Sequence, residues 1–148
     1  MRRVFFLLFF VFVAFSCEKE YYTTIPKFPV NLKLNLDDMK DLNAGLSCKI
    51  FTKPRLDSDR LGYGGILVIN GGDYPINLFA YDLACPVEAQ PNIRVTPDAK
   101  NSNITATCAK CGAVFSIASG YGNPQSGTRY SLRRYNVFRD GMQYVVTN

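Results

Sequence analysis

The sequence predicts an all-β domain, and three observations carry this prediction. Hydrophobic and polar residues alternate from Val30 to Leu36, which is the period of a half-buried strand. Turn signals of the hairpin type, Asn70-Gly71-Gly72-Asp73 and Asp140-Gly141, each separate two hydrophobic segments. No segment after residue 45 sustains the 3.6-residue period of a helix. Short strands at regular spacing, with turn residues between them, are typical of a β-sandwich or barrel.

The expected elements follow one another closely along the chain. After the alternating strand we expect one helical turn within residues 37–45, and a second strand that begins at Ile50. The apolar run Gly64–Ile69 predicts a buried strand, with Ile76–Tyr81 as its hairpin partner. Further strands are expected at residues 93–95, 104–107, 113–117, 132–138 and 142–147. Five phenylalanines are expected in the core: Phe28, Phe51, Phe79, Phe115 and Phe138.

The residue composition excludes several classes of function. The 148 residues contain no histidine, which excludes serine and cysteine hydrolases that use an imidazole, histidine-based zinc catalysis and histidine-ligated haem. The sequence also offers no nucleophile with an adjacent base, so we expect at most an electron-transfer subunit rather than an enzyme. The formal charge is +5, and it falls to +3 if Arg2 and Arg3 are removed with the first segment. This balance does not indicate a nucleic-acid partner.

The first residues have the pattern of a targeting signal. Arg2 and Arg3 precede an uncharged apolar stretch, residues 4–15, that is too short for a spanning helix. The stretch ends in Ala14-Phe15-Ser16-Cys17 and resembles a bacterial lipoprotein signal, although Phe15 is bulkier than is usual there. The resemblance implies a signal peptide over 1–16, acylation of Cys17, a tether over 17–28 and a β domain over 29–148. It also implies a location in the cell envelope, outside the cytoplasm and anchored to a membrane by lipid. The alternative is a plain signal peptide with Cys17 as an ordinary thiol.

Three later cysteines form the candidate site. In Cys108-Ala109-Lys110-Cys111-Gly112 two residues separate the thiols, so both sulfurs of one tight turn can face one ion, and the glycine allows a positive φ. A redox dithiol of this spacing usually opens a helix, whereas the residues that follow are strand-like. Cys85 closes an earlier strand, in the segment Tyr81–Val87.

The wider pattern resembles the Rieske iron–sulfur domain over roughly residues 62–146. Its two cluster loops read C-x-H and C-x-x-H-G-x-x-F, and they are followed by a loop rich in glycine and proline and an L-x-x-Y-x-V strand. Here the matching residues are Cys85, Cys108–Phe115, Gly120, Gly127, Leu132, Tyr135 and Val137. The resemblance implies stacked antiparallel sheets with a two-loop, cluster-binding tip, and it makes Cys85 and Cys108 the cysteine ligands. Val87 and Cys111 stand where the family has its histidines, so this chain cannot build a true Rieske centre.

Several outcomes remain open for the altered site. Cys85, Cys108 and Cys111 could hold a [2Fe–2S] cluster, with a fourth ligand from Glu88, Cys48 or another chain, in a membrane-anchored electron carrier with a protein redox partner. The alternative is a non-redox surface binding or structural module, with the thiols on zinc, in a disulfide, or without any cofactor. Cys48 has an apolar context and is expected to be a buried small side chain rather than a ligand.

Overall fold

The computed structural model describes residues 22–72 and 75–148, and within these ranges the fold is all-β with antiparallel sheets. The predicted fold class is therefore confirmed at this level. The expected signal peptide, Cys17 and the start of the expected tether lie outside the described residues. None of the helices in the described part is long and apolar enough to cross a membrane.

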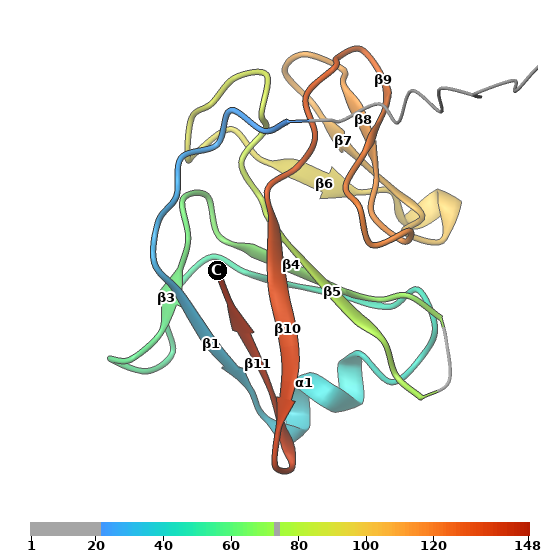
Figure 1. Ribbon diagram of the computed structural model, residues 1–148. Helices are drawn as coiled ribbons and strands as arrows, with labels where there is room; N and C mark the ends of the chain where they lie inside the picture. Colours follow the sequence, from blue (N-terminus) through green and yellow to red (C-terminus); the bar gives the residue numbers. More distant parts are fainter. Residues whose placement is uncertain (1–21, 73–74) are drawn as a thin grey trace, which may run out of the picture.

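The strands form two sheets (Figure 1). A seven-stranded sheet has the order β2-β4-β5-β10-β11-β1-β3, and a four-stranded sheet has the order β6-β7-β8-β9. The strands of the larger sheet are β1 Val30–Leu34, β2 Cys48–Phe51, β3 Arg60–Leu61, β4 Ile66–Asn70, β5 Leu78–Asp82, β10 Arg134–Asp140 and β11 Gln143–Thr147. Those of the smaller sheet are β6 Val95–Pro97, β7 Thr105–Cys108, β8 Val114–Ser116 and β9 Pro124–Ser126. A helix, α1 Leu36–Asp41, and a 3₁₀ turn, Ala99–Asn101, complete the described elements.

Strand β4 lies between β2 and β5 and is buried on both faces, as its uninterrupted apolar sequence predicts. Ile66 and Val68 point into a core that the curled larger sheet closes around, together with side chains of β1 and β11. Leu67 and Ile69 point the opposite way, into a second core shared with the smaller sheet. One strand therefore couples the two hydrophobic clusters of the domain.

The smaller sheet is an insertion between two neighbouring strands of the larger one. β5 and β10 pair directly, with Tyr81 opposite Arg134, although some fifty residues separate them in the sequence. The chain leaves the larger sheet after Asp82, builds the four short strands, and returns at β10 (Figure 1). The smaller sheet lies at one end of the domain, and α1 lies at the other (Figure 1).

The expected strands are found, with two additions and several corrections of extent. The hairpins β4–β5 and β10–β11 pair as their turn signals predict. The first strand ends at Leu34, because Asn35 already caps α1. Strands β3 and β9 were not expected, since each has only two or three residues and little hydrophobic pattern. Phe28 and Phe138 are exposed at 45% and 49%, so the prediction of a core position was wrong for these two.

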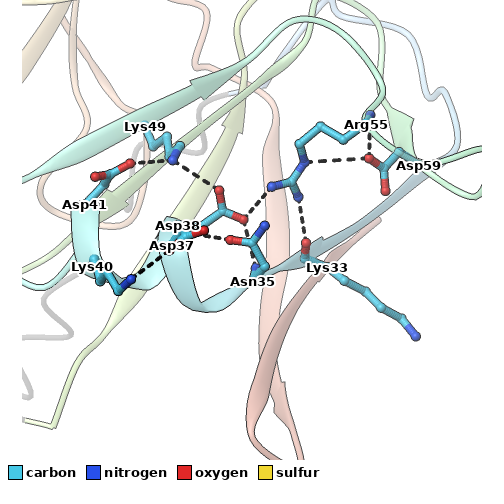
Figure 2. Close-up of polar contacts among 9 residues, drawn as sticks. All are labelled: Lys33, Asn35, Asp37, Asp38, Lys40, Asp41, Lys49, Arg55 and Asp59. Carbon is cyan, nitrogen blue, oxygen red and sulfur yellow. Dashed lines mark hydrogen bonds and ion pairs between the residues drawn. The ribbon is translucent and has the colours of Figure 1, made fainter.

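A buried carboxylate fixes α1 against the neighbouring strand (Figure 2). Asp38 is 2% exposed and closes a capping box with Asn35, each side chain accepting from the other's backbone N–H at 2.8 Å. Its carboxylate also pairs with Arg55 at 2.6 Å and Lys49 at 3.2 Å. Burial alone would raise the pKa of Asp38, but the hydrogen bonds from Arg55, the Asn35 N–H and Lys49 outweigh it, and the pKa lies below its ordinary value.

We expect Asp38→Asn to destabilise the domain by about 2 kcal/mol at neutral pH, because the amide keeps the shape but loses the ion pairs. A carboxyl group with a depressed pKa stabilises the fold above its unfolded pKa of about 4, and this contribution is lost as the pH falls through the folded value. The difference between variant and wild type, measured by urea denaturation, should therefore shrink in acid. Asp37→Asn is the control, because that side chain is 80% exposed and should change stability little. Equal effects of the two substitutions would contradict the role given to Asp38.

Candidate metal centre

Three sulfur atoms meet at one end of the smaller sheet. The thiols of Cys85, Cys108 and Cys111 all lie within 4.8 Å of one another. The Sγ atoms of Cys85 and Cys111 are 3.6 Å apart, too far for a disulfide bond of about 2.05 Å. Cys85 and Cys108 are buried and Cys111 is partly exposed. The three residues that the sequence singled out are therefore brought together, across the 26 positions that separate Cys85 from Cys111.

The cysteines stand on two loops with the same backbone design. The first cysteine loop is residues 85–89, and the second cysteine loop is residues 108–112. In the first, the N–H of Ala89 donates to the carbonyl of Cys85, and in the second the N–H of Gly112 donates to the carbonyl of Cys108, both at 2.9 Å. Ala89 and Gly112 both have a positive φ, of 49° and 72° respectively. Each loop is thus a tight turn that closes four residues after its leading cysteine.

Backbone N–H groups act on the leading sulfur of each loop. Burial raises the pKa of the Cys85 thiol to about 12, while hydrogen bonds from the N–H groups of Glu88 and Val87 act in the opposite direction. Burial also disfavours the Cys108 thiolate, but the N–H groups of Cys111 and Lys110, together with the thiol of Cys85, outweigh it and lower the pKa. Both turns therefore direct N–H donors at a sulfur. At Cys108 these donors outweigh burial and favour the thiolate that a metal requires, whereas at Cys85 burial prevails.

The first cysteine loop is held to the larger sheet by the carboxylate of Asp82, which is fully buried. Its Oδ1 accepts from the N–H of Gly64 at 2.9 Å and from that of Ala84 at 2.8 Å. Its Oδ2 accepts from the N–H of Tyr63 at 2.7 Å and from the Tyr135 hydroxyl at 2.5 Å. Because Ala84 directly precedes Cys85, this carboxylate sets where the first cysteine loop begins.

Close backbone packing also fixes the start of the first cysteine loop. A Cβ added at Gly64 would meet the backbone nitrogen of Ala84 at 2.6 Å, so only glycine fits there. The carbonyl of Gly64 accepts from Arg94 at 2.6 Å, and the N–H of Cys85 donates to the carbonyl of Ile93 at 2.8 Å. The far side of the first cysteine loop is held by the Tyr63 hydroxyl, which donates to the carbonyl of Ala89 at 3.0 Å.

The second cysteine loop is the turn of the β7–β8 hairpin. Cys108 is the last residue of β7 and pairs with Val95 of β6, while its N–H donates to the carbonyl of Ala113 at 2.9 Å. The sequence Cys108–Gly112 therefore folds locally, as its spacing predicts. Its position against the first cysteine loop comes from the core beneath both, which includes Leu83 and Phe115.

The remaining residues that the sequence indicated near the site lie outside the three-sulfur group. Cys48, on β2, packs against the same core, and burial raises the pKa of its thiol, but it is not part of the three-sulfur group. Val87, at the expected place of a histidine, is 38% exposed. Glu88 is largely buried, and its carboxylate pairs with Lys110 of the second cysteine loop at 2.7 Å.

The donor set and its spacing fit a single metal ion. Four ligands at about 2.3 Å around a tetrahedral zinc ion lie about 3.8 Å from one another. The three sulfurs, with one pair at 3.6 Å and all within 4.8 Å, are close to that arrangement. Three such cysteines can bind a metal, and thiolate ligands suit zinc, copper(I) and iron.

Comparison of the chain with protein-family models, with curated proteins and with solved structures found no match. The resemblance to the Rieske family therefore remains an expectation from the cysteine, glycine and strand motifs of the sequence.

We expect Ala89→Gly to stabilise the protein by roughly 0.5–1 kcal/mol, because an alanine with φ of 49° is strained and glycine is not. Gly112→Ala, at the equivalent position, should destabilise by about 1 kcal/mol, since a Cβ there meets no atom within 4 Å and only the backbone is strained. Urea denaturation measures both. Ala109→Gly is the control in the same turn and should not stabilise. A loss of stability in Ala89→Gly would show that the two turns are not equivalent.

Proposed function

We propose that this protein is a lipid-anchored envelope module whose β domain is stabilised by one zinc ion bound to Cys85, Cys108 and Cys111. The observation that carries the proposal is the packing of three sulfurs from two loops into one group. In this role the ion is structural and takes part in no reaction. It joins the first cysteine loop, near the start of the insertion, to the second cysteine loop, which is the turn between β7 and β8.

The spacing favours one ion over a two-iron cluster. If Cys111 replaced a Rieske histidine, its sulfur would bind a different iron from Cys85 and Cys108. Ligands of different irons lie farther apart than ligands of the same ion. The Sγ atoms of Cys85 and Cys111 are instead 3.6 Å apart, which is the separation of two ligands on one centre.

The surroundings of the sulfurs also favour a metal over a disulfide. N–H donors from the turns act on the sulfurs of Cys85 and Cys108 and lower the pKa of Cys108, while burial still raises that of Cys85, so its thiolate would need the positive charge of an ion. Pairing any two of the three would leave the third as a lone thiol. A divalent ion can bind all three sulfurs at once, and it thereby connects the two cysteine loops.

The second candidate is an electron carrier in which the same thiolates hold iron. The feature that favours it is Cys111, whose partly exposed position gives a bound iron a short route to a redox partner. N–H groups directed at the sulfurs are also a means by which proteins tune iron–sulfur potentials. The two candidates differ in the metal and in colour.

The anchor proposed at Cys17 would hold the cysteine loops near the membrane. Within the expected tether, Thr24 donates a hydrogen bond to the carbonyl of Pro86, in the first cysteine loop. Ile25 is buried, and its carbonyl accepts from Arg133 at 2.7 Å. Seven residues lead from Cys17 to Thr24, which is at most about 25 Å of extended chain. A surface partner would therefore meet the side of the domain away from this end.

The metal content of the full chain, purified in detergent under reducing and oxygen-free conditions, tests the first proposal. We expect one zinc per chain by elemental analysis, and a stabilisation of about 3–4 kcal/mol when free zinc is 100 to 1,000 times its dissociation constant. Cys111→Ser should abolish both, because one of three sulfurs is lost, whereas Cys48→Ser is the matched control and should retain both. A coloured protein with iron would favour the electron carrier, and a colourless, metal-free wild type would contradict both candidates.

The anchor is tested by expressing the full chain in a bacterium and labelling it with palmitate. We expect the wild type to take up the label and to sediment with the membranes, because the lipid would be attached at Cys17. Cys17→Ala should take up none and should keep residues 1–16, which mass spectrometry of the N-terminus measures. Equal labelling of the two proteins would contradict a lipid at this residue.

A further inference from the structure

We propose that Glu88 supplies the fourth ligand of the metal centre, so that the site is three thiolates and one carboxylate. This inference rests on the proposed function and names the residue that completes it. It follows from the correspondence between the two cysteine loops and from the position of the Glu88 side chain between them.

The correspondence assigns equivalent roles to residues at equivalent places. Both turns close by a 2.9 Å hydrogen bond from the fifth residue to the first, and both have a positive φ at the fifth residue. The first residues are Cys85 and Cys108. The fourth residues are Glu88 and Cys111, and Cys111 points its sulfur into the group. A turn of this shape therefore directs its first and fourth side chains toward a common point, and in the first cysteine loop the fourth side chain is a carboxylate.

The side chain of Glu88 is held near that point. It is only 16% exposed, although it stands on a loop, and Lys110 of the second cysteine loop pairs with its Oε2 atom at 2.7 Å. Lys110 directly precedes Cys111 and also interacts electrostatically with Cys108 and Cys111. The ion pair thus spans the gap between the two loops beside the sulfurs. The carboxylate lies outside the 4.8 Å sulfur group itself, so coordination requires rotation about its side-chain bonds.

The chemistry of the site favours this residue over its neighbours. Zinc in structural sites has four ligands, and aspartate or glutamate oxygen is an accepted one at about 2.0–2.2 Å. Val87 carries no donor atom and Lys110 carries a positive charge. Cys48 is not in the sulfur group. A carboxylate has two oxygens, so one can bind the ion while Oε2 remains with Lys110, and ligating carboxylates are commonly held by such a partner.

The charge of the site in this assignment requires a nearby cation, and the structure supplies one. Three thiolates and a carboxylate around a divalent ion carry two excess negative charges, which a buried site tolerates poorly. The ammonium group of Lys110 pairs with the Glu88 carboxylate and offsets one of these two negative charges. In this arrangement Lys110 is a positioning residue, and only Glu88 contacts the metal.

Titration of the full chain with Co²⁺, in detergent and under reducing, oxygen-free conditions, tests the proposal. Co²⁺ is used because its visible spectrum reports the number of sulfur ligands, and competition with a chelator gives the affinity. We expect Glu88→Gln to weaken binding by about 100-fold or more, whereas removing a group that only supports a ligand costs about 10- to 100-fold. Lys110→Ala is the control, because it breaks the same ion pair and leaves the carboxylate in place, and it should weaken binding less than Glu88→Gln.

A gain of function completes the test. Glu88→Cys should give a four-thiolate spectrum, with stronger sulfur-to-cobalt absorption than the wild type. The new thiol would take the place in the first cysteine loop that Cys111 has in the second. Equal affinity of Glu88→Gln and wild type, or an unchanged spectrum in Glu88→Cys, would overturn the assignment of Glu88 while leaving the three-cysteine centre intact. Failure of the wild type to bind Co²⁺ would instead overturn the proposed function.

Discussion

The buried carboxylate of Asp82 is the constraint on which the arrangement of the domain depends. It stands at the end of β5, where the chain leaves the larger sheet, and it accepts hydrogen bonds from the turn at Tyr63 and Gly64, from Ala84 and from the hydroxyl of Tyr135 on β10. The same group therefore joins the departing strand, the returning strand and the start of the first cysteine loop. A buried carboxylate is costly without partners, and here four donors satisfy it.

From this point the fold explains why a metal centre would lie where it does. The four strands of the smaller sheet have three or four residues each, and their hydrophobic contacts are shared with the outer face of β4 and β5. Short strands bury little surface of their own, so loops at their ends need additional restraints. Hydrogen bonds from backbone, glycine packing and the contact between Glu88 and Lys110 supply some of these restraints. An ion that joins the two loops would supply another in the same place.

The two cysteine loops show how one backbone solution can be reached from different sequences. The second has the familiar spacing, with glycine at the position of positive φ. The first has alanine at that position and a glutamate where the second has a cysteine, so its sequence does not predict the turn. The equivalence is visible only in the hydrogen bonds and the φ angles, and this is why Glu88 could be named from the sequence only as one of several ligands.

Local patterns determined most of the strands, the two hairpins, the burial of β4 and the turn at Cys108–Gly112, because each depends on residues that are neighbours in the chain. The tertiary structure decided the rest. The meeting of Cys85 with Cys111 depends on the packing of two sheets, and the role of Asp82 depends on partners up to 53 positions away. It also left Phe28 and Phe138 exposed, since a hydrophobic residue is buried only where another element covers it. Periodicity describes which face a residue occupies, and only the packed fold determines what lies against that face.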